Sequence, residues 1–254
     1  MVESVANGLS LWRFENLLRH LDIAHFVSAR TGGSSKAPYT SLNVSYAAGD
    51  EKDYVERNWR TLSDSLGIPE ERMVIGQQTH GDGVAAVSDV GPVGEADALI
   101  SMTPGVCLKV IVADCVPILL FDPTNKCVAA IHAGRRSTAL RIAFKTVRRM
   151  VGEYGCRVED MVAGIGPSIG PCHYVVDDAI VRAVGEHYEA DRTEERKPFL
   201  DLWSANRDQL LASGLQEQNI EIAGMCTWCC NDLFFSARKE GALSGRFSAG
   251  IMLV

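Results

Sequence analysis

The sequence predicts a mixed α/β or α+β fold. Short apolar segments rich in β-branched residues alternate with longer segments of helical periodicity, and they follow one another in uneven order rather than as a repeat. Apolar residues make up 46% of the 254 residues and charged residues 22%, as in an ordinary globular protein with a buried core. No linker divides the chain, so we expect a single domain over residues 23–254, preceded by an N-terminal extension (1–22) of little structural role.

The N-terminal half is expected to begin with a strand over 23–29, followed by a glycine-rich loop at Gly32 and Gly33. Tyr54, Trp59 and Leu62 recur near helical spacing, which predicts a helix ending at 67–69, where glycine and proline follow. Further strands are predicted at 73–75, 84–87, 106–112, 118–121 and 127–131.

The C-terminal half carries an amphipathic pattern that predicts a helix over 139–151 and then a strand over 161–165. Residues 166–171 contain two Gly-Pro steps, which forbid regular structure, so this segment is predicted to be a loop. Helices near 178–188 and 203–212 are expected to precede a strand over 220–223, and the charged segment 190–197 is expected to be a surface loop.

Three short stretches each end in one metal-ligand residue flanked by small side chains: His80, Cys115 and His132. Gly81 directly follows His80 and Gly134 lies two residues after His132, and a residue without Cβ allows close approach to a ligand. Two imidazoles and one thiolate form a three-ligand zinc set, which leaves the fourth tetrahedral position for water or substrate, as in catalytic rather than structural zinc sites. The pattern therefore predicts a metalloenzyme.

Two other interpretations use the same residues. In the first, Cys115 is the nucleophile of a cysteine hydrolase, His132 is its base, and no metal is needed. In the second, the histidines are hydrogen-bonded turn residues and Cys115 is a small buried hydrophobe. A non-catalytic binding module would also fit that second interpretation.

A series of eight motifs resembles the YfiH-like family, also called laccase-domain or polyphenol-oxidase-like proteins, from about His25 to the C-terminus. The motifs occupy residues 30–34, 38–43, 78–81, 96–99, 113–117, 132–134, 166–171 and 234–236. The resemblance implies a layered α-β-β-α fold and a zinc site at His80, Cys115 and His132. It also implies purine nucleoside phosphorylase activity, with adenosine deaminase and methylthioadenosine phosphorylase as side activities.

For such a reaction the partners are a nucleoside and phosphate, and a planar guanidinium binds phosphate in bidentate fashion. The motifs point to Arg30, Arg60 and Arg136 as candidate phosphate ligands, with a salt bridge or plain solvent exposure as the alternative for each. Asn43 and Gln78 are candidates for hydrogen bonds to the sugar or base, with turn capping as the alternative.

Asp114 is a candidate to orient a histidine ligand or to act as a general acid or base, because it directly precedes Cys115.

Two positions depart from the family pattern. Arg135 stands where the family usually has tryptophan, and Trp59 stands where it usually has arginine. A compensating exchange between two side chains in contact would explain both departures, since arginine and tryptophan stack well. If the two do not touch, Arg135 is better interpreted as a substrate contact.

The segment Cys226-Thr227-Trp228-Cys229-Cys230 contains a Cys-x-x-Cys pair, which can be redox-active or half of a zinc site. No second Cys-x-x-Cys pair exists, and Cys172-His173 is the only other close pair of ligands. We expect a structural role for these cysteines, the usual fate of buried free thiols.

Composition and charge restrict which cofactor, which partners and which cellular location we expect. Six histidines without a His-x-His pair fit a multi-copper oxidase poorly, so copper is disfavoured against zinc. A net charge of −7 gives no basic footprint for nucleic acid, and no apolar run is long enough for a membrane span. With no visible secretory signal and eight cysteines, we expect reduced thiols and a cytoplasmic location. The sequence carries no signal for an oligomeric state.

Overall fold

A computed structural model describes residues 1–254 as two six-stranded sheets with helices on their outer faces. The first sheet comprises β1 (Val2–Ala6), β2 (Leu9–Arg13), β3 (Ile23–Ser28), β4 (Met73–Val74), β7 (Cys107–Val112) and β14 (Phe247–Leu253). The second comprises β5 (Val84–Ala86), β6 (Ala98–Ser101), β8 (Val116–Asp122), β9 (Cys127–Ala133), β10 (Val162–Ile165) and β13 (Ile220–Ile222). A separate hairpin joins β11 (Glu189–Arg192) to β12 (Pro198–Leu200).

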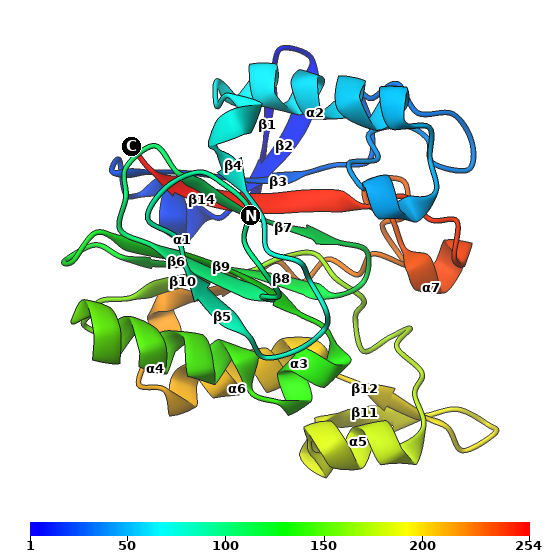
Figure 1. The fold of residues 1–254 in the computed structure, drawn as a ribbon. Coiled ribbons are helices and arrows are strands. Elements are labelled where there is room, and N and C mark those ends of the chain that lie inside the picture. The colour runs from blue at the N-terminus through cyan, green and yellow to red at the C-terminus, as the bar shows by residue number, and fades with distance from the viewer.

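The strand order is β1-β2-β3-β14-β7-β4 in the first sheet and β13-β10-β8-β9-β6-β5 in the second. The helices are α1 (Glu15–Leu18), α2 (Lys52–Leu66), α3 (Arg135–Ala139), α4 (Ile142–Tyr154), α5 (Asp178–Val184), α6 (Leu202–Ala212) and α7 (Ala237–Glu240). Helix α2 covers the outer face of the first sheet, and α3, α4 and α6 cover the outer face of the second (Figure 1). The expected α-β-β-α layering of a mixed α/β single domain is therefore confirmed.

Strand β8 shows how the sequence builds these layers. All its residues are buried, and successive side chains of a strand point to opposite faces. Ile118 and Leu120 accordingly pack with α4 and α6, whereas Leu119 and Phe121 pack between the two sheets. A strand buried on both faces reads as a continuous apolar run, which is why this strand could be predicted from its sequence.

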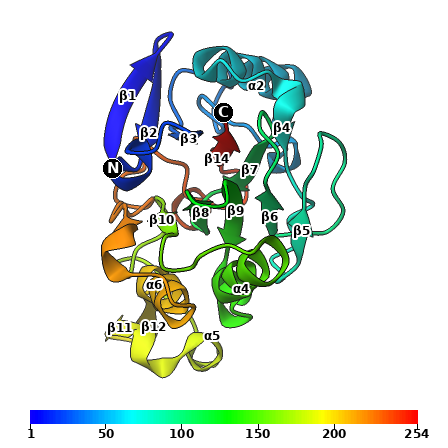
Figure 2. The ribbon, with the colours of Figure 1, turned by 90° about the vertical axis from the view of Figure 1, so that its left-hand side faces the viewer.

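The first 22 residues are part of the domain, so the expectation of an extension with little role is wrong. Strand β2 pairs with both β1 and β3, which extends the first sheet (Figure 2). Leu11 and Phe14 are fully buried. Phe14 lies against the backbone of Gly164 in β10 of the other sheet, where a Cβ at Gly164 would come within 2.5 Å of its ring. The segment therefore closes one end of the space between the sheets.

Replacing Phe14 with alanine is expected to lower the free energy of unfolding by about 3 to 5 kcal/mol, because a large buried side chain is lost and Gly164 cannot fill the cavity. Urea unfolding followed by circular dichroism measures this change. Val5, which is 71% exposed in the same hairpin, provides the control, and its replacement by alanine should change stability by less than about 0.5 kcal/mol. Equal, small effects at both positions would restore the view of a dispensable extension.

Other differences from the expected elements have local causes. Strand β14 runs through the centre of the first sheet but was not predicted, because its serine, alanine and glycine residues lack β-strand propensity. Gly250 in this strand is needed where the Phe26 ring lies against the backbone. Strand β6 was also not predicted, and β11 occupies part of the expected loop at 190–197. The expected helix over 139–151 begins only at Ile142, because Arg141 has a left-handed backbone conformation. No helix is long and apolar enough to cross a membrane.

The proposed exchange between Trp59 and Arg135 is also wrong. Trp59 is buried on the inner side of α2, and its ring contacts the ammonium of Lys109, with Nζ 3.4 Å from the ring centroid. Arg135 begins α3, on the opposite outer face of the molecule (Figure 1). The cation that accompanies Trp59 is therefore a lysine from β7, and Arg135 requires a separate explanation.

Candidate functional site

The three predicted ligands converge. His80 lies in the turn after β4, Cys115 lies in the turn between β7 and β8, and His132 lies near the end of β9. One ligand atom from each lies within 4.8 Å of the others. The two imidazole rings are 4.8 Å apart and almost perpendicular. His132 is buried, Cys115 is partly exposed and His80 is exposed, so the cluster is open to solvent on the His80 side.

Asp97 orients His132. Its Oδ1 lies 2.7 Å from Nδ1 of His132, and its backbone carbonyl accepts a hydrogen bond from the His132 amide. Pairing between β6 and β9 sets this contact, because Ala98 lies opposite Ile131. With Nδ1 held by a carboxylate, Nε2 is the nitrogen free to bind a metal, an arrangement that is common at metal-binding histidines.

The same carboxylate organises the turn that carries His80. Asp97 accepts hydrogen bonds from the backbone amides of Thr79, His80 and Gly81, and His80 has a positive φ of 56°. Burial raises the pKa of Asp97, but the His132 imidazole and the amides outweigh it and lower the pKa to about 2. Asp97 is therefore a carboxylate that holds two of the three ligands. We did not identify it from the sequence, although it lies in the 96–99 motif.

The surroundings of Cys115 favour the thiolate form of its side chain. Burial acts to raise its pKa, but the rings of His132 and His80 outweigh burial and lower the pKa below the usual range of a thiol. Thiolate is the form of cysteine that binds metal. Two imidazoles and a thiolate whose ligand atoms lie within 4.8 Å of one another fit a single divalent transition-metal ion with one position open.

Gly134 lies between these ligands, and a Cβ at this position would come within 3.0 Å of both Cys115 Sγ and His80 Cδ2. Replacing Gly134 with alanine is expected to displace one ligand and weaken metal binding by at least about 10-fold, since metal sites require ligands placed within a few tenths of an ångström. Chelator competition measures the affinity. Alanine at Gly152, where a Cβ meets nothing within 4 Å, is the control and should leave metal affinity unchanged.

Asp114 does not orient a histidine. Its Oδ1 accepts hydrogen bonds from the hydroxyls of Thr227 and Ser236, at 2.6 and 2.7 Å, and its Oδ2 accepts one from the amide of Arg238 at 2.6 Å. Asp114 also has a positive φ of 80°, which turns the chain sharply before Cys115. It therefore ties the Cys115 turn to the segments around 227 and 236–238. Asp97 fills the histidine-orienting role predicted for Asp114, and the alternative role of Asp114 as a general acid or base stays a prediction.

Two cavities meet at the ligands. One, of about 420 Å³, is lined by His80, Cys115 and His132 together with mainly apolar groups such as Ile75 and Ile111. The other, of about 590 Å³, shares His80 and Cys115 but is lined by Tyr174 and three guanidinium groups. These belong to Arg135, Arg136 and Arg238. The metal-binding cluster therefore lies between an apolar cavity and an arginine-lined cavity.

The candidate substrate residues separate into two groups. Arg136 lines the arginine-lined cavity and Gln78 lines the apolar one, where its amide also exchanges two hydrogen bonds with the backbone of Ile111. Arg30 and Asn43 are structural instead. Arg30 pairs with Glu240 at 2.9 Å and donates hydrogen bonds to backbone carbonyls. Asn43 is fully buried and shapes its own turn, as the capping alternative predicted.

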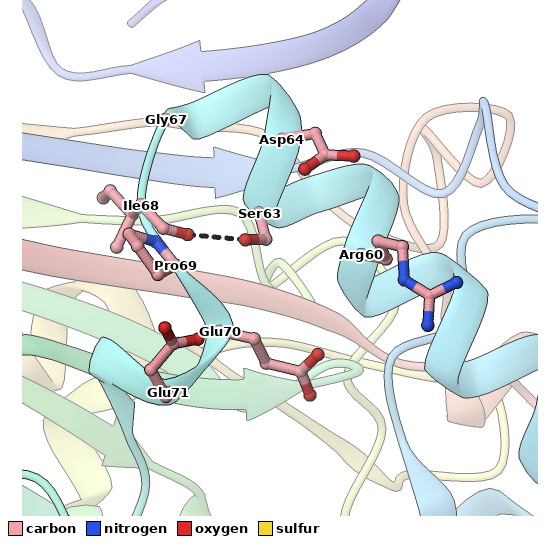
Figure 3. Close-up of a pocket in the computed structure, with 8 residues that line it drawn as sticks. All are labelled: Arg60, Ser63, Asp64, Gly67, Ile68, Pro69, Glu70 and Glu71. Carbon is pink, nitrogen blue, oxygen red and sulfur yellow. Dashed lines mark hydrogen bonds between the residues drawn. The ribbon is translucent and has the colours of Figure 1, made fainter.

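Arg60 is not brought to the ligands. It lies on the exposed face of α2 and lines a separate hollow with Ser63, Asp64 and the acidic turn at Glu70 and Glu71 (Figure 3). None of the residues around this hollow borders either cavity at the metal-binding cluster.

The lining residues that were not identified from the sequence include Arg238, Arg246 and Tyr174. Arg246 borders the apolar cavity, and burial lowers the pKa of its guanidinium. Arg238 stacks over the ring of Tyr174, 4.9 Å from its centroid. They lie more than 40 residues from any ligand along the chain, so spacing alone carried no signal for them.

The fold and site define a layered α/β protein with an open His-Cys-His metal-binding centre. The model of the family described as multi-copper polyphenol oxidoreductase laccase matches residues 24–254, and this chain belongs to that family. A Bacteroides thetaiotaomicron protein named purine nucleoside phosphorylase is 37% identical over 98% of both chains. A protein from an unknown prokaryotic organism, named adenosine deaminase RL5, is 33% identical over 89% of this chain and 92% of its own length.

Solved structures of the family share the whole architecture. The crystal structure of YlmD from Geobacillus stearothermophilus has a TM-score of 0.91 and 33% identity, covering 98% of this chain and 97% of its own. That of the hypothetical protein YfiH from Bacillus licheniformis has a TM-score of 0.92 and 29% identity, covering 98% of each chain. The similarity includes the N-terminal segment that the sequence alone did not assign to the domain.

Proposed function

We propose that the protein is a zinc-dependent purine nucleoside phosphorylase, which converts a purine nucleoside and phosphate to the free base and pentose 1-phosphate. The observation that carries this proposal is the position of the three ligands between an apolar cavity and an arginine-lined cavity. An apolar cavity suits a purine, and arginines suit phosphate. Relatives from Bacteroides thetaiotaomicron and Geobacillus stearothermophilus that are named purine nucleoside phosphorylases support the same reaction class.

His80, Cys115 and His132 would hold the zinc, since one ligand atom from each lies within 4.8 Å of the others. Bound zinc supplies a Lewis acid that polarises an oxygen or lowers the pKa of water. Six histidines in the whole chain do not provide the additional imidazoles that a multi-copper centre needs, which favours zinc over copper.

The protein side chains do the remaining work. Arg135, Arg136 and Arg238 bind phosphate beside the ligands and offset its charge, so that it is held in position to attack the anomeric carbon. Gln78 and Arg246 border the opposite cavity and present hydrogen-bond donors to the nucleoside. In this proposal Arg135 is a third phosphate ligand, which explains why it replaces the tryptophan that is usual in the family.

Adenosine deamination is the second reaction of the same centre, with water in place of phosphate as the nucleophile. The relative named adenosine deaminase RL5 supports it. Incubating adenosine or inosine with and without phosphate tests both reactions by chromatography of the products. We expect free base and ribose 1-phosphate only when phosphate is present, and inosine from adenosine in either case. Base release at the same rate without phosphate would identify a nucleosidase, and no turnover of any nucleoside would refute the proposal.

Replacing Arg136 with alanine is expected to raise KM for phosphate by about 10- to 100-fold, the loss of one charge-assisted hydrogen-bonding group, with a smaller effect on KM for the nucleoside. Steady-state kinetics with each substrate varied in turn measures both constants. Arg148 is exposed on α4, away from both cavities, and Arg148→Ala is the control. Equal KM for phosphate in the two variants would remove Arg136 from the phosphate site.

One observation favours a second candidate function. Asp97, His132 and Cys115 form a connected series of carboxylate, imidazole and thiol, which is also the arrangement of a metal-free cysteine hydrolase. Metal analysis separates the two functions. A phosphorolytic activity that is lost with a chelator and restored by zinc supports the metalloenzyme, whereas full activity of metal-free protein together with loss on alkylation of Cys115 supports the hydrolase.

We also propose that the protein works in the cytoplasm on small molecules. None of the eight cysteines is in a disulfide, which fits a reducing compartment. The net charge of −7 does not favour nucleic acid as a partner.

A further inference from the structure

A second group of metal-ligand side chains lies outside the site described above. Cys172, His173, Cys226 and Cys229 each place one ligand atom within 4.8 Å of the other three. None of them lines either cavity at the metal-binding cluster. The two pairs are more than 50 residues apart in the sequence, so only the fold could bring them together.

The distances fit a tetrahedral zinc ion. With Zn–S near 2.3 Å and Zn–N near 2.0 Å, tetrahedral geometry places two sulfur ligands about 3.8 Å apart and a sulfur and a nitrogen about 3.5 Å apart. In this group Cys172 Sγ and Cys229 Sγ are 3.7 Å apart. His173 Nδ1 lies 3.2 Å from Cys172 Sγ and 3.4 Å from Cys229 Sγ. Three thiols and one imidazole make one of the common closed sets of structural zinc.

The surroundings hold these donors in place. Cys226 is buried, and the backbone amide of Gly170 donates a hydrogen bond to its sulfur at 3.2 Å. Such a contact stabilises a thiolate. The imidazole of His173 stacks on the indole of Trp228, with ring centroids 5.1 Å apart and planes at 12°, so Nδ1 is directed to the sulfurs. Backbone hydrogen bonding of the parallel β type between Ser168 and Cys226 aligns the segment before Cys172 with the segment that begins at Cys226.

We propose that Cys172, His173, Cys226 and Cys229 bind a structural zinc ion, distinct from the ion of the open site. The ion would fasten the loop over 166–174 to the turn over 225–230. Both segments support the open site, because Thr227 holds Asp114 and Tyr174 lines the arginine-lined cavity. The structural role that we expected for the cysteines near 226 thus becomes a specific one, in which four residues share one ion.

The proposal is tested in the Cys115→Ala variant, which removes a ligand of the open site only. This variant should still bind about one equivalent of zinc per chain, and with Co²⁺ it should show the visible bands of a tetrahedral site and an intense thiolate-to-cobalt charge-transfer band. Adding Cys229→Ser should abolish the band. Cys230→Ser is the matched control, because Cys230 adjoins Cys229 but is not among the four donors, and it should retain both metal and band.

The unmodified protein provides a second test that does not depend on the folding of variants. Cys172 and Cys229 are exposed, so a thiol-alkylating reagent can reach them. We expect zinc-loaded protein to resist alkylation at both positions, and chelator-treated protein to be alkylated at both, at least 10-fold faster, as measured by peptide mass spectrometry. Returning zinc should restore protection, and metal removal should lower Tm.

Three results would overturn the proposal. The first is a Cys115→Ala variant that binds no metal in zinc-supplemented medium while its Cys172 and Cys229 are alkylated at the same rate with and without chelator. The second is that Cys229→Ser and Cys230→Ser, each added to Cys115→Ala, retain equal amounts of metal. The third is a disulfide between Cys172 and Cys229. It would lower the mass of the protein by 2 Da, and both cysteines would be alkylated only after reduction. Because all three measure metal or thiols rather than nucleoside turnover, they are independent of the proposed phosphorylase activity.

Discussion

Replacing Cys115 with alanine is expected to lower kcat/KM for phosphorolysis by about 10² to 10⁴, because a Lewis-acid metal contributes several kcal/mol to transition-state stabilisation. The variant should lose zinc from the open site and keep its fold. We expect side-chain removal to be tolerated because Cys115 is a small, partly exposed turn residue at the edge of the apolar core. Metal analysis, circular dichroism and steady-state kinetics measure the three outcomes together.

The control for this prediction is Cys230→Ser, which alters another partly exposed thiol outside both metal-binding groups and should leave kcat/KM within about twofold. Loss of folding together with zinc in Cys115→Ala would indicate that the open site is structural. Full activity after loss of zinc would exclude a catalytic role for the metal.

Replacing Asp97 with asparagine is expected to weaken zinc binding by about 10- to 100-fold and to lower activity in parallel, since partners of metal-bound histidines have effects of this size. Both carboxylate oxygens of Asp97 accept hydrogen bonds, from the amides of Thr79, His80 and Gly81 and from the His132 ring. Asparagine has only one accepting oxygen, and its other terminal atom is an NH₂ donor. In the variant the NH₂ group therefore faces an N–H group that has lost its acceptor. A buried polar group left without a hydrogen bond costs about 1 to 3 kcal/mol of stability. Chelator competition and urea unfolding measure the two effects.

The pH dependence of stability provides a further measurement of the role of Asp97. Its pKa is lowered in the folded state to about 2, so its stabilising contribution is present above the unfolded pKa of about 3.9 and is lost as the pH falls toward 2. Asp97→Asn should therefore flatten the fall in stability between about pH 4 and 2. Asp82→Asn, which removes an exposed partner of Lys145 two residues beyond His80, is the control and should leave zinc affinity unchanged. Equal zinc affinity in the two variants would contradict the role of Asp97.

Local sequence patterns predicted the elements whose burial is visible in a short window. Strands β8 and β9 and helix α2 were predicted because continuous apolar runs and helical periodicity reflect the layers that each element faces. The N-terminal hairpin and β14 were missed. Phe14 is buried against Gly164, about 150 residues away, and no local pattern reports such a partner. Burial by remote segments therefore set the limit of the fold prediction.

The site shows the same division. His80, Cys115 and His132 could be identified from residue type and from the glycines that leave room beside them. Asp97 could not be chosen over Asp114, because the choice depends on strand pairing that places Ala98 opposite Ile131. Arg60 was grouped with Arg136 by motif, yet α2 places it at a separate hollow.

The sequence by itself determined which donors this chain possesses: two histidines and a cysteine with small neighbours, and a cysteine pair at Cys226 and Cys229. Tertiary structure decided which donors share a centre. Cys172 and His173 lie beside Cys226 and Cys229 because backbone β-pairing joins Ser168 to Cys226. Arg238 lines the same cavity as Arg136 because Asp114 accepts a hydrogen bond from the amide of Arg238. The physical reason is that metal and phosphate sites depend on distances of a few ångströms between segments far apart in the chain, which sheet pairing and buried hydrogen bonds establish and residue type alone does not.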